Sequence, residues 1–361
     1  MAWTPPLRDE LRGVEPYGAP QLDVPVQLNT NENPYGPSAA VIADIATTVA
    51  QACATLNRYP DRDFDDLRDA LAAYLADESG VRLDRAQIWA ANGSNEVMLH
   101  LLQAFGGPGR TAMSFAPTYS MYPEYARDTH TAWIQGHRNE DFSFDFAHAA
   151  DLIAEHRPSV VLLPSPNNPT GTALPHDVID RLAGLVGDGV LVIDEAYAEF
   201  RRTGSPSALE LLADHPNLVV TRTMSKAFAA AGLRLGYLGA DARICDALRV
   251  VRLPYHLSAT TQATALASLR HAGELLGAVA ELRAERDALV DWLRGAGFEV
   301  ADSDANFVLF GRFENRHAIW RALLDHGVLI REVGPEGWLR VSVGTPEEMN
   351  AFKRALKEVM A

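Results

Sequence analysis

The stretch NLVVTRTMSK, residues 217–226, is an apolar run that ends in a polar segment. Three earlier stretches have the same form: TAMSFAP at 111–117, VVLLPSP at 160–166 and VLVIDEAY at 190–197. Short runs that are apolar at nearly every position are typical of strands buried on both faces of a parallel sheet. Segments with the apolar spacing of helices alternate with them, which predicts an α/β fold. In such sheets, functional residues gather just beyond the carboxyl ends of the strands.

The composition changes twice along the chain of 361 residues, a length that suits two domains. Residues 1–37 are rich in proline, which breaks long elements, and we expect them to form an N-terminal arm. Residues 38–257 carry the alternating pattern and are expected to form a large domain. Residues 258–361 begin with a long helical stretch and are expected to form a smaller α+β domain. Its last helix is predicted to begin after Thr345, with Glu348 returning the cap.

The charge balance restricts the partners of the chain. Acidic residues outnumber basic ones by 47 to 32, which argues against a nucleic-acid partner, because a phosphate backbone requires stripes of Lys and Arg. A small anionic ligand stays possible, since a few local Arg residues would bind it. The two cysteines are far apart and belong to no metal-binding pattern, so no metal site is expected. We find no apolar leader and no membrane-spanning run, and we expect a cytoplasmic protein.

Lys226 directly follows the strand quoted first. A lysine in this position is most often a solvated side chain, but here Thr223, Ser225 and Arg234 accompany it. A phosphorylated aldehyde cofactor such as pyridoxal phosphate requires these groups together: an amine that forms an imine, hydroxyls that bind phosphate and a fixed cation. A cationic, partly desolvated site also lowers the pKa of a lysine and frees its amine. The segment therefore predicts a cofactor bound through Lys226.

Other strand ends offer the remaining parts of such a site. Asp194 ends an apolar strand, where a carboxylate is costly without a partner, and it could keep the pyridine nitrogen of the cofactor protonated. The ordinary alternative is a helix N-cap. Tyr197 and Asn168 could reach the phenolic oxygen of the cofactor, although Asn168 lies in PSPNNPTG, which is also typical of a simple rigid turn.

Two further segments are weaker signals. Gly93-Ser94-Asn95 lies between an expected strand and an expected helix, an arrangement that forms an anion site from backbone N–H groups. Tyr119 offers a flat ring that could stack on the pyridine, although an aromatic residue here would ordinarily belong to the core. The order of all these segments matters, because each supplies a different part of one cofactor site.

With these motifs in place, the chain resembles the fold-type I aminotransferases, and within them the histidinol-phosphate aminotransferases. The resemblance covers nearly the whole chain and is carried by LNTNENPYGP, NGSNE, PTYSMY, SPNNPTG, IDEAYAEF and RTMSKAFAAAGLRLGY. It implies a large domain that binds pyridoxal phosphate, built on a mostly parallel seven-stranded sheet between helices, and a smaller C-terminal domain.

The resemblance also implies roles for individual residues. Lys226 is the imine lysine and moves the proton, Asp194 pairs with the pyridinium, and Tyr119 stacks on the ring. Tyr197 and Asn168 bind the phenolic oxygen. The cofactor phosphate is held by Ser94, Asn95, Thr223, Ser225 and Arg234. Tyr59 reaches that phosphate from the other subunit, which implies a homodimer with shared active sites.

Substrate recognition falls by resemblance on Arg331 and Arg340, with Tyr17 and Asn31 from the arm. A guanidinium suits a carboxylate or a phosphate. The implied reaction converts histidinol phosphate and 2-oxoglutarate to imidazole-acetol phosphate and glutamate, in histidine biosynthesis. Three alternatives remain open: an aromatic amino-acid aminotransferase, a phosphate-ester decarboxylase and a non-catalytic regulator with the same fold. The first two differ from the main hypothesis in the substrate pocket, to which Tyr17, Tyr122, Tyr255 and His256 are candidate contributors.

Overall fold

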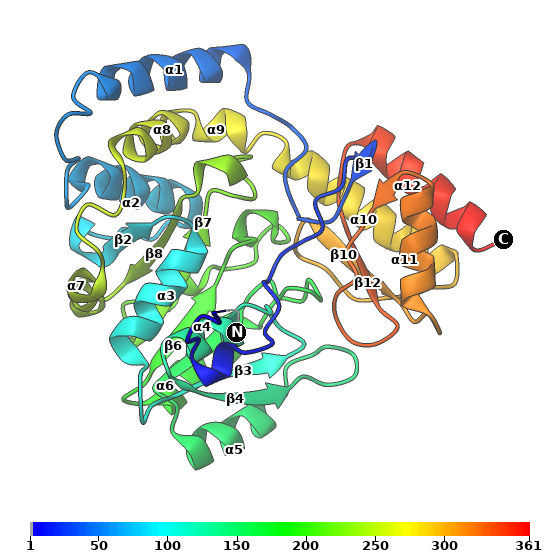
Figure 1. Cartoon of the computed structure of the whole chain (residues 1–361), viewed down its shortest axis with the longest axis horizontal. Coiled ribbons are helices and arrows are strands. Elements are labelled where there is room, and N and C mark those ends of the chain that lie inside the picture. Colours follow the sequence, from blue (N-terminus) through cyan, green and yellow to red (C-terminus); the bar gives the residue numbers. More distant parts are fainter. Residues whose placement is uncertain (1–2) are drawn as a thin grey trace.

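The computed structural model describes residues 3–361. Its larger body is built on a seven-stranded sheet, seen beside a smaller body in Figure 1. The strand order is β2-β8-β7-β6-β5-β3-β4, and all strands run parallel except β8. The mostly parallel α/β sheet is thereby confirmed. The strands are β2 (Ile88–Ala91), β3 (Thr111–Ala116), β4 (Ala132–His137), β5 (Val160–Pro164), β6 (Val190–Asp194), β7 (Leu218–Thr223) and β8 (Gly236–Ala240).

The central strands form the core of the larger body. Every residue of β5, β6 and β7 is buried, as their continuous apolar runs predict, because helices cover both faces of the sheet. The helices of the larger body are α1 (Ala39–Cys53), α2 (Asp65–Ser79), α3 (Ser94–Phe105), α4 (Tyr122–Asp128), α5 (Phe146–His156), α6 (His176–Val186), α7 (Ala242–Val251), α8 (Ala259–Arg270) and α9 (Ala272–Leu275). Short 3-10 turns are η1 (Asp9–Leu11), η2 (Arg85–Gln87), η3 (Ala198–Phe200), η4 (Ala208–Leu211) and η5 (Ala231–Leu233).

The smaller body has an antiparallel sheet of order β12-β10-β9 packed against three helices. Its last helix has the predicted capping box, since Thr345 Oγ1 accepts from the Glu348 amide at 3.3 Å and the Thr345 amide donates to Glu348 Oε2 at 2.8 Å. The elements are α10 (Val279–Gly295), β9 (Glu299–Val300), β10 (Phe307–Gly311), α11 (Arg316–Asp325), β11 (Val328–Leu329), β12 (Leu339–Ser342) and α12 (Pro346–Val359).

The packing of the arm and of α8 bears on the domain limits. Strand β1 (Val26–Gln27), within the expected arm, pairs in parallel with β11 of the smaller body. Helix α8 packs along α1, and Ala265 belongs to the core of the larger body, whereas the core of the smaller body includes Val279. We therefore propose that the boundary lies between α9 and α10 instead of between residues 257 and 258.

Within residues 3–361, no helix has both the length and the apolar character that a membrane span requires. The described residues also contain no group of three or more His, Cys, Asp or Glu side chains placed to hold a metal ion.

Candidate active site

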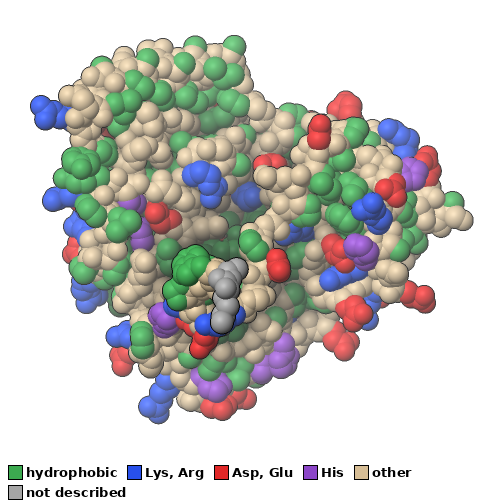
Figure 2. Space-filling model, in the orientation of Figure 1, with side chains coloured by type: hydrophobic (Ala, Val, Ile, Leu, Met, Phe, Trp, Pro, Cys, Tyr) green, Lys and Arg blue, Asp and Glu red, His purple; other side chains and the backbone are tan. Residues whose placement is uncertain are grey.

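A cavity lies where the carboxyl ends of β5, β6 and β7 meet the arm and the smaller body, and Figure 2 shows the surface hollowed between the two bodies. All the predicted site residues except Tyr59 line it: Tyr17, Asn31, Ser94, Asn95, Tyr119, Asn168, Asp194, Tyr197, Thr223, Ser225, Lys226, Arg234, Arg331 and Arg340. The sheet therefore brings together residues that lie far apart in the sequence, as expected of strand ends in a parallel sheet.

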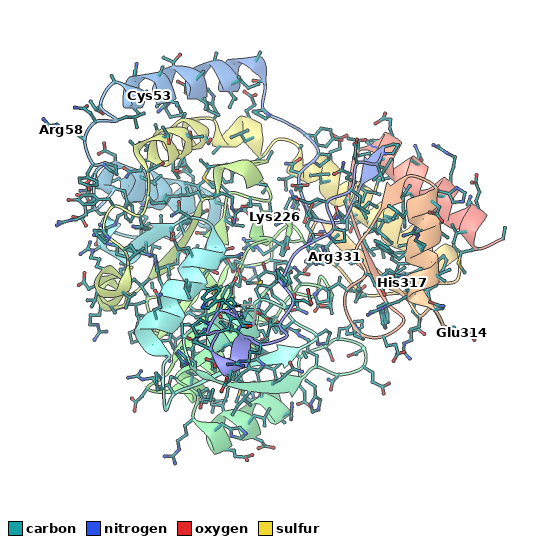
Figure 3. All side chains as sticks on the ribbon, in the orientation of Figure 1. Cys53, Arg58, Lys226, Glu314, His317 and Arg331 are labelled. Atoms are coloured by element: carbon teal, nitrogen blue, oxygen red, sulfur yellow. The ribbon has the colours of Figure 1, made fainter. Side chains whose placement is uncertain are left out.

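Lys226 follows β7 and lies between the two bodies (Figure 3). Its Nζ donates to the main-chain oxygen of Thr30 in the arm at 2.8 Å. Burial lowers the pKa of Lys226 to about 8, and the positive charge of Arg340 contributes to this shift. Near neutral pH, an appreciable fraction of this amine is therefore unprotonated and nucleophilic.

Asp194, at the end of β6, is buried and accepts hydrogen bonds only from neutral groups. Tyr122 donates to Oδ2 at 3.0 Å and Thr221 donates to Oδ1 at 3.0 Å. Burial raises the pKa of Asp194, since these hydrogen bonds offset only part of the cost of desolvation. No cationic side chain within residues 3–361 pairs with this carboxylate, so its charge suits a positively charged ligand group in the cavity.

Another part of the cavity is suited to an anion. Helix α3 begins at Ser94 directly after Gly93, and the N-terminus of a helix presents backbone N–H groups and a partial positive charge. Arg234 packs over Gly93 so closely that a Cβ on the glycine would lie 2.6 Å from Arg234 Nη2. Arg234 Nη1 also donates to Ser225 Oγ at 3.2 Å. These donors form a cradle suited to a phosphate group. The Thr223 hydroxyl also lines the cavity, but it donates to the Leu235 carbonyl at 3.2 Å and accepts from the Ser225 amide at 3.1 Å.

A chain of hydrogen bonds joins Arg340 to Tyr197. Arg340 Nη1 donates to Asn168 Oδ1 at 2.6 Å, and Asn168 Nδ2 donates to the Tyr197 hydroxyl at 3.3 Å. Arg340 Nη2 donates to the main-chain oxygen of Asn29 at 2.8 Å, and its Nε is buried with no acceptor among the described residues. Burial lowers the pKa of Arg340 to about 10, with a contribution from the charge of Arg331.

The arm forms one wall of the cavity. Tyr17 accepts from Ser120 Oγ at 3.2 Å, and Arg331 Nη2 donates to the main-chain oxygen of Gly18 at 3.1 Å. The amide and carbonyl of Arg331 pair with those of Arg340, which brings the two guanidinium groups to the same side of the cavity. Tyr119 is half-buried in the wall and donates to Asn95 Oδ1 at 3.4 Å.

Of the four candidate residues of the substrate pocket, Tyr17 lines the cavity and the other three do not. Tyr122, a candidate for that pocket, is fully buried and bonds Asp194 instead. Tyr255 and His256 do not line the cavity: Tyr255 stacks on Tyr59 at 4.5 Å and His256 stacks on Trp89. Tyr59 itself is 79% exposed, so its expected contact with a second subunit stays a prediction.

Two residues that bond to the expected catalytic side chains were not predicted from the sequence. Thr221 and Thr30, which bond Asp194 and Lys226, were not singled out. Thr221 could have been found, because Asp194 and Thr221 are register partners on neighbouring parallel strands. The role of Thr30 depends on its main-chain oxygen, which no sequence pattern reveals.

Comparison with known proteins agrees with this geometry. A family model described as aminotransferase class I and II matches residues 24–356. The chain belongs to this aminotransferase family. The histidinol-phosphate aminotransferase of Thermobifida fusca is 62% identical over 97% of this chain and 94% of its own length. That of Bifidobacterium longum is 58% identical over 98% of this chain and 96% of its own length.

Among solved structures, this aminotransferase is similar to the histidinol-phosphate aminotransferase of Sinorhizobium meliloti in complex with pyridoxal-5'-phosphate. The TM-score is 0.81 at 24% identity, over 93% of this chain and 91% of that chain. At this level of identity the likeness concerns the fold, and it agrees with a fold-type I architecture for the aminotransferase.

Proposed function

We propose that the chain is a cytoplasmic aminotransferase that uses pyridoxal phosphate to transfer the amino group of histidinol phosphate to 2-oxoglutarate, in histidine biosynthesis. The observation that carries this proposal is the pair Arg331 and Arg340 beside Lys226 in one cavity. Neither guanidinium forms an ion pair with a carboxylate within residues 3–361. The names of the relatives that are 58% and 62% identical support the same substrate.

The donor set fits pyridoxal phosphate. The uncompensated carboxylate of Asp194 suits a protonated pyridine nitrogen, and the cradle of Ser94, Ser225 and Arg234 suits a phosphate. When bound, the cofactor supplies an aldehyde that exchanges the amino group and a ring that accepts electrons. The Tyr197 hydroxyl and the Asn168 amide lie in the cavity wall where a phenolic oxygen can be bound.

The proton transfer is assigned to Lys226. Its Nζ combines a pKa of about 8 with a place in the cavity, so it can take a proton from the substrate carbon and return it. The main-chain oxygen of Thr30 would hold the amine when it is not bonded to the cofactor. Leu28, Asn29 and Asn31 of the arm are buried, and this part of the arm limits the access of water to the base.

Arg331 and Arg340 are assigned to the anionic group of the substrate. The buried Nε of Arg340 has no acceptor among the described residues and is available to a ligand oxygen. A phosphate dianion gains more from two adjacent cations than a carboxylate does, because the attraction scales with the product of the charges. A pair of guanidinium groups therefore favours a phosphate ester while still accepting glutamate.

We expect kcat/KM for histidinol phosphate to exceed that for phenylalanine, each measured against 2-oxoglutarate. Arg331→Gln should lower kcat/KM for histidinol phosphate by about 10- to 100-fold, the contribution of a hydrogen bond between charged groups, and should affect phenylalanine less. Arg321→Gln on the exposed face of α11 is the matched control, since its nearest carboxylate contact is a long one of 3.8 Å to Asp325. Comparable or better kcat/KM for phenylalanine would contradict the assigned substrate and favour an aromatic amino-acid aminotransferase.

We also propose that the chain works as a homodimer. Large apolar side chains are exposed on and near α1, where Figure 2 shows hydrophobic groups gathered along the top of the molecule. Ile42 in α1 is 53% exposed and Leu56, just after that helix, is 57% exposed. Leu253 is 75% exposed and lies two residues before Tyr255, which stacks on Tyr59. Exposed apolar patches of this kind mark protein–protein contacts. The patch is close to Tyr59, the residue expected to reach the partner's cavity.

We expect light scattering after size-exclusion chromatography to give twice the chain mass of 39.3 kDa. Leu56→Asp places a charge in the proposed interface and should shift the protein toward the monomer and reduce its activity together. Leu185→Asp, also on an exposed leucine but on α6, should leave the dimer intact. A fully active wild-type monomer would rule out the shared site.

A further inference from the structure

The hydroxyl of Tyr197 accepts hydrogen bonds from two side-chain amides. Asn31 Nδ2 donates to it at 3.0 Å and Asn168 Nδ2 donates at 3.3 Å. A tyrosine oxygen has two lone pairs and one proton, so these amides occupy its accepting capacity. Tyr197 is only 5% exposed and donates to no acceptor within residues 3–361. Its proton is therefore left to point into the cavity.

The orientation of each amide is determined by its other neighbour. A guanidinium can only donate, so the bond from Arg340 Nη1 turns the oxygen of Asn168 toward the arginine and its nitrogen toward Tyr197. Ser342 Oγ accepts from the main-chain amide of Asn31 at 2.9 Å and lies 2.9 Å from Asn31 Oδ1. Since the serine is buried, its hydroxyl proton requires an acceptor, and Asn31 Oδ1 supplies it.

Asn31 is also held through its backbone. It has a positive φ of 57°, a left-handed conformation that Asn and Asp adopt more readily than most residues. Asn306 Nδ2 donates to its carbonyl at 3.0 Å, and the amide of Ser342 donates to the carbonyl of Leu28 at 2.9 Å. The arm is thus fixed to β12 at the point where Asn31 meets Tyr197. Both polar side-chain atoms of Asn31 are already bonded, which leaves little capacity for the substrate contact expected from the sequence.

We propose that Ser342 and Asn31 are positioning residues that keep the Tyr197 hydroxyl as a hydrogen-bond donor toward the phenolic oxygen of the cofactor. The proposal rests on the proposed function, because the oxygen addressed belongs to pyridoxal phosphate. A donor at that oxygen stabilises its anionic form and lowers the pH at which the bound cofactor loses its proton. Ser342 and Asn31 would set this pH without touching the cofactor. Because Asn31 belongs to the arm and Ser342 to β12, the pH would also depend on whether the arm is docked.

Asn31→Asp tests the proposal with almost no change in size, and aspartate tolerates the left-handed backbone. The substitution replaces a donor by an acceptor, so the Tyr197 proton turns away from the cavity toward the new carboxylate. We expect the pH midpoint of the visible absorbance of the holoenzyme to rise by about one to two units, the equivalent of a hydrogen bond to a charged group. Ser342→Ala, which introduces no charge, should raise the midpoint by a smaller amount.

The new carboxylate could also act through its charge alone, and a double-mutant cycle separates the two effects. In a Tyr197→Phe background the shift caused by Asn31→Asp should largely disappear. An equal shift in both backgrounds, or no shift with Asn31→Asp and Ser342→Ala, would overturn the positioning role. Failure of the proposed function looks different: the wild-type protein would then show no titrating absorbance after reconstitution with pyridoxal phosphate.

Discussion

Lys226→Ala is expected to lower turnover by at least about 10⁴-fold and to abolish the visible absorbance that arises when the cofactor is bonded to the protein. In the proposed mechanism Lys226 combines two functions at one atom, since Nζ would bond the cofactor and would then move the proton. Its pKa of about 8 suits both, because the unprotonated amine is accessible near neutral pH. Alanine offers neither function, so the two losses should occur together. Steady-state kinetics with histidinol phosphate and an absorbance spectrum measure them.

Lys226→Arg is the matched control for charge. Arginine keeps a cation in the cavity, but its guanidinium stays protonated and serves neither as a nucleophile nor as a base. We therefore expect it to be as inactive as Lys226→Ala. An alanine variant that kept the colour and the activity of the wild type would contradict the role of Lys226. A wild-type protein that stays colourless with pyridoxal phosphate would instead favour a non-catalytic regulator with this fold.

The fold and the gathering of the expected cofactor-binding residues in one cavity could be predicted, because they depend on local patterns. Continuous apolar runs determine which strands are buried, and the parallel sheet then brings Asp194 and Lys226 to one edge. The proposed boundary between the two bodies was harder to predict from the sequence. Helices α8 and α10 lie in one long stretch of helical sequence, although α8 packs on α1 of the larger body. A sequence pattern shows that a segment is helical, but the packing partner depends on the tertiary structure.

The substrate and arm side of the site was harder to predict because its contacts are long-range. Asn31 and Ser342 lie 311 positions apart in sequence and meet only when the arm docks on β12. The role of Thr30 depends on a main-chain oxygen. Tyr122 could be expected near the cavity, but its bond to Asp194 follows from the direction in which α4 turns its side chain. Contacts of this kind depend on how distant segments pack in three dimensions, and no local pattern in the sequence reveals them.

Asp194→Asn should reduce kcat by roughly two to three orders of magnitude, the effect expected when one partner of a buried charge pair is removed. The substitution preserves the size of the side chain, and the amide oxygen can still accept from Thr221. A neutral amide, however, cannot compensate a protonated pyridine nitrogen, so the ring becomes a weaker electron acceptor. We also expect weaker binding of pyridoxal phosphate, measured by titration of the cofactor-free protein.

The stability of the same variant should change in opposite directions with and without the cofactor. Burial raises the pKa of Asp194 in the folded cofactor-free protein, so the folded state holds this proton more tightly than the unfolded state does. Protonated Asp194 therefore contributes to the free energy of unfolding at pH values below the pKa that it has in the unfolded chain. This contribution is lost as the pH rises through the higher pKa that Asp194 has in the folded protein. At neutral pH, Asp194→Asn should therefore raise the Tm of the cofactor-free protein, and this gain should shrink at acid pH.

With pyridoxal phosphate bound the variant should melt below the wild type, because the favourable charge pair is gone. An equal loss of Tm in both forms would show that Asp194 only supports the fold, and the charge pairing with the cofactor would have to be abandoned.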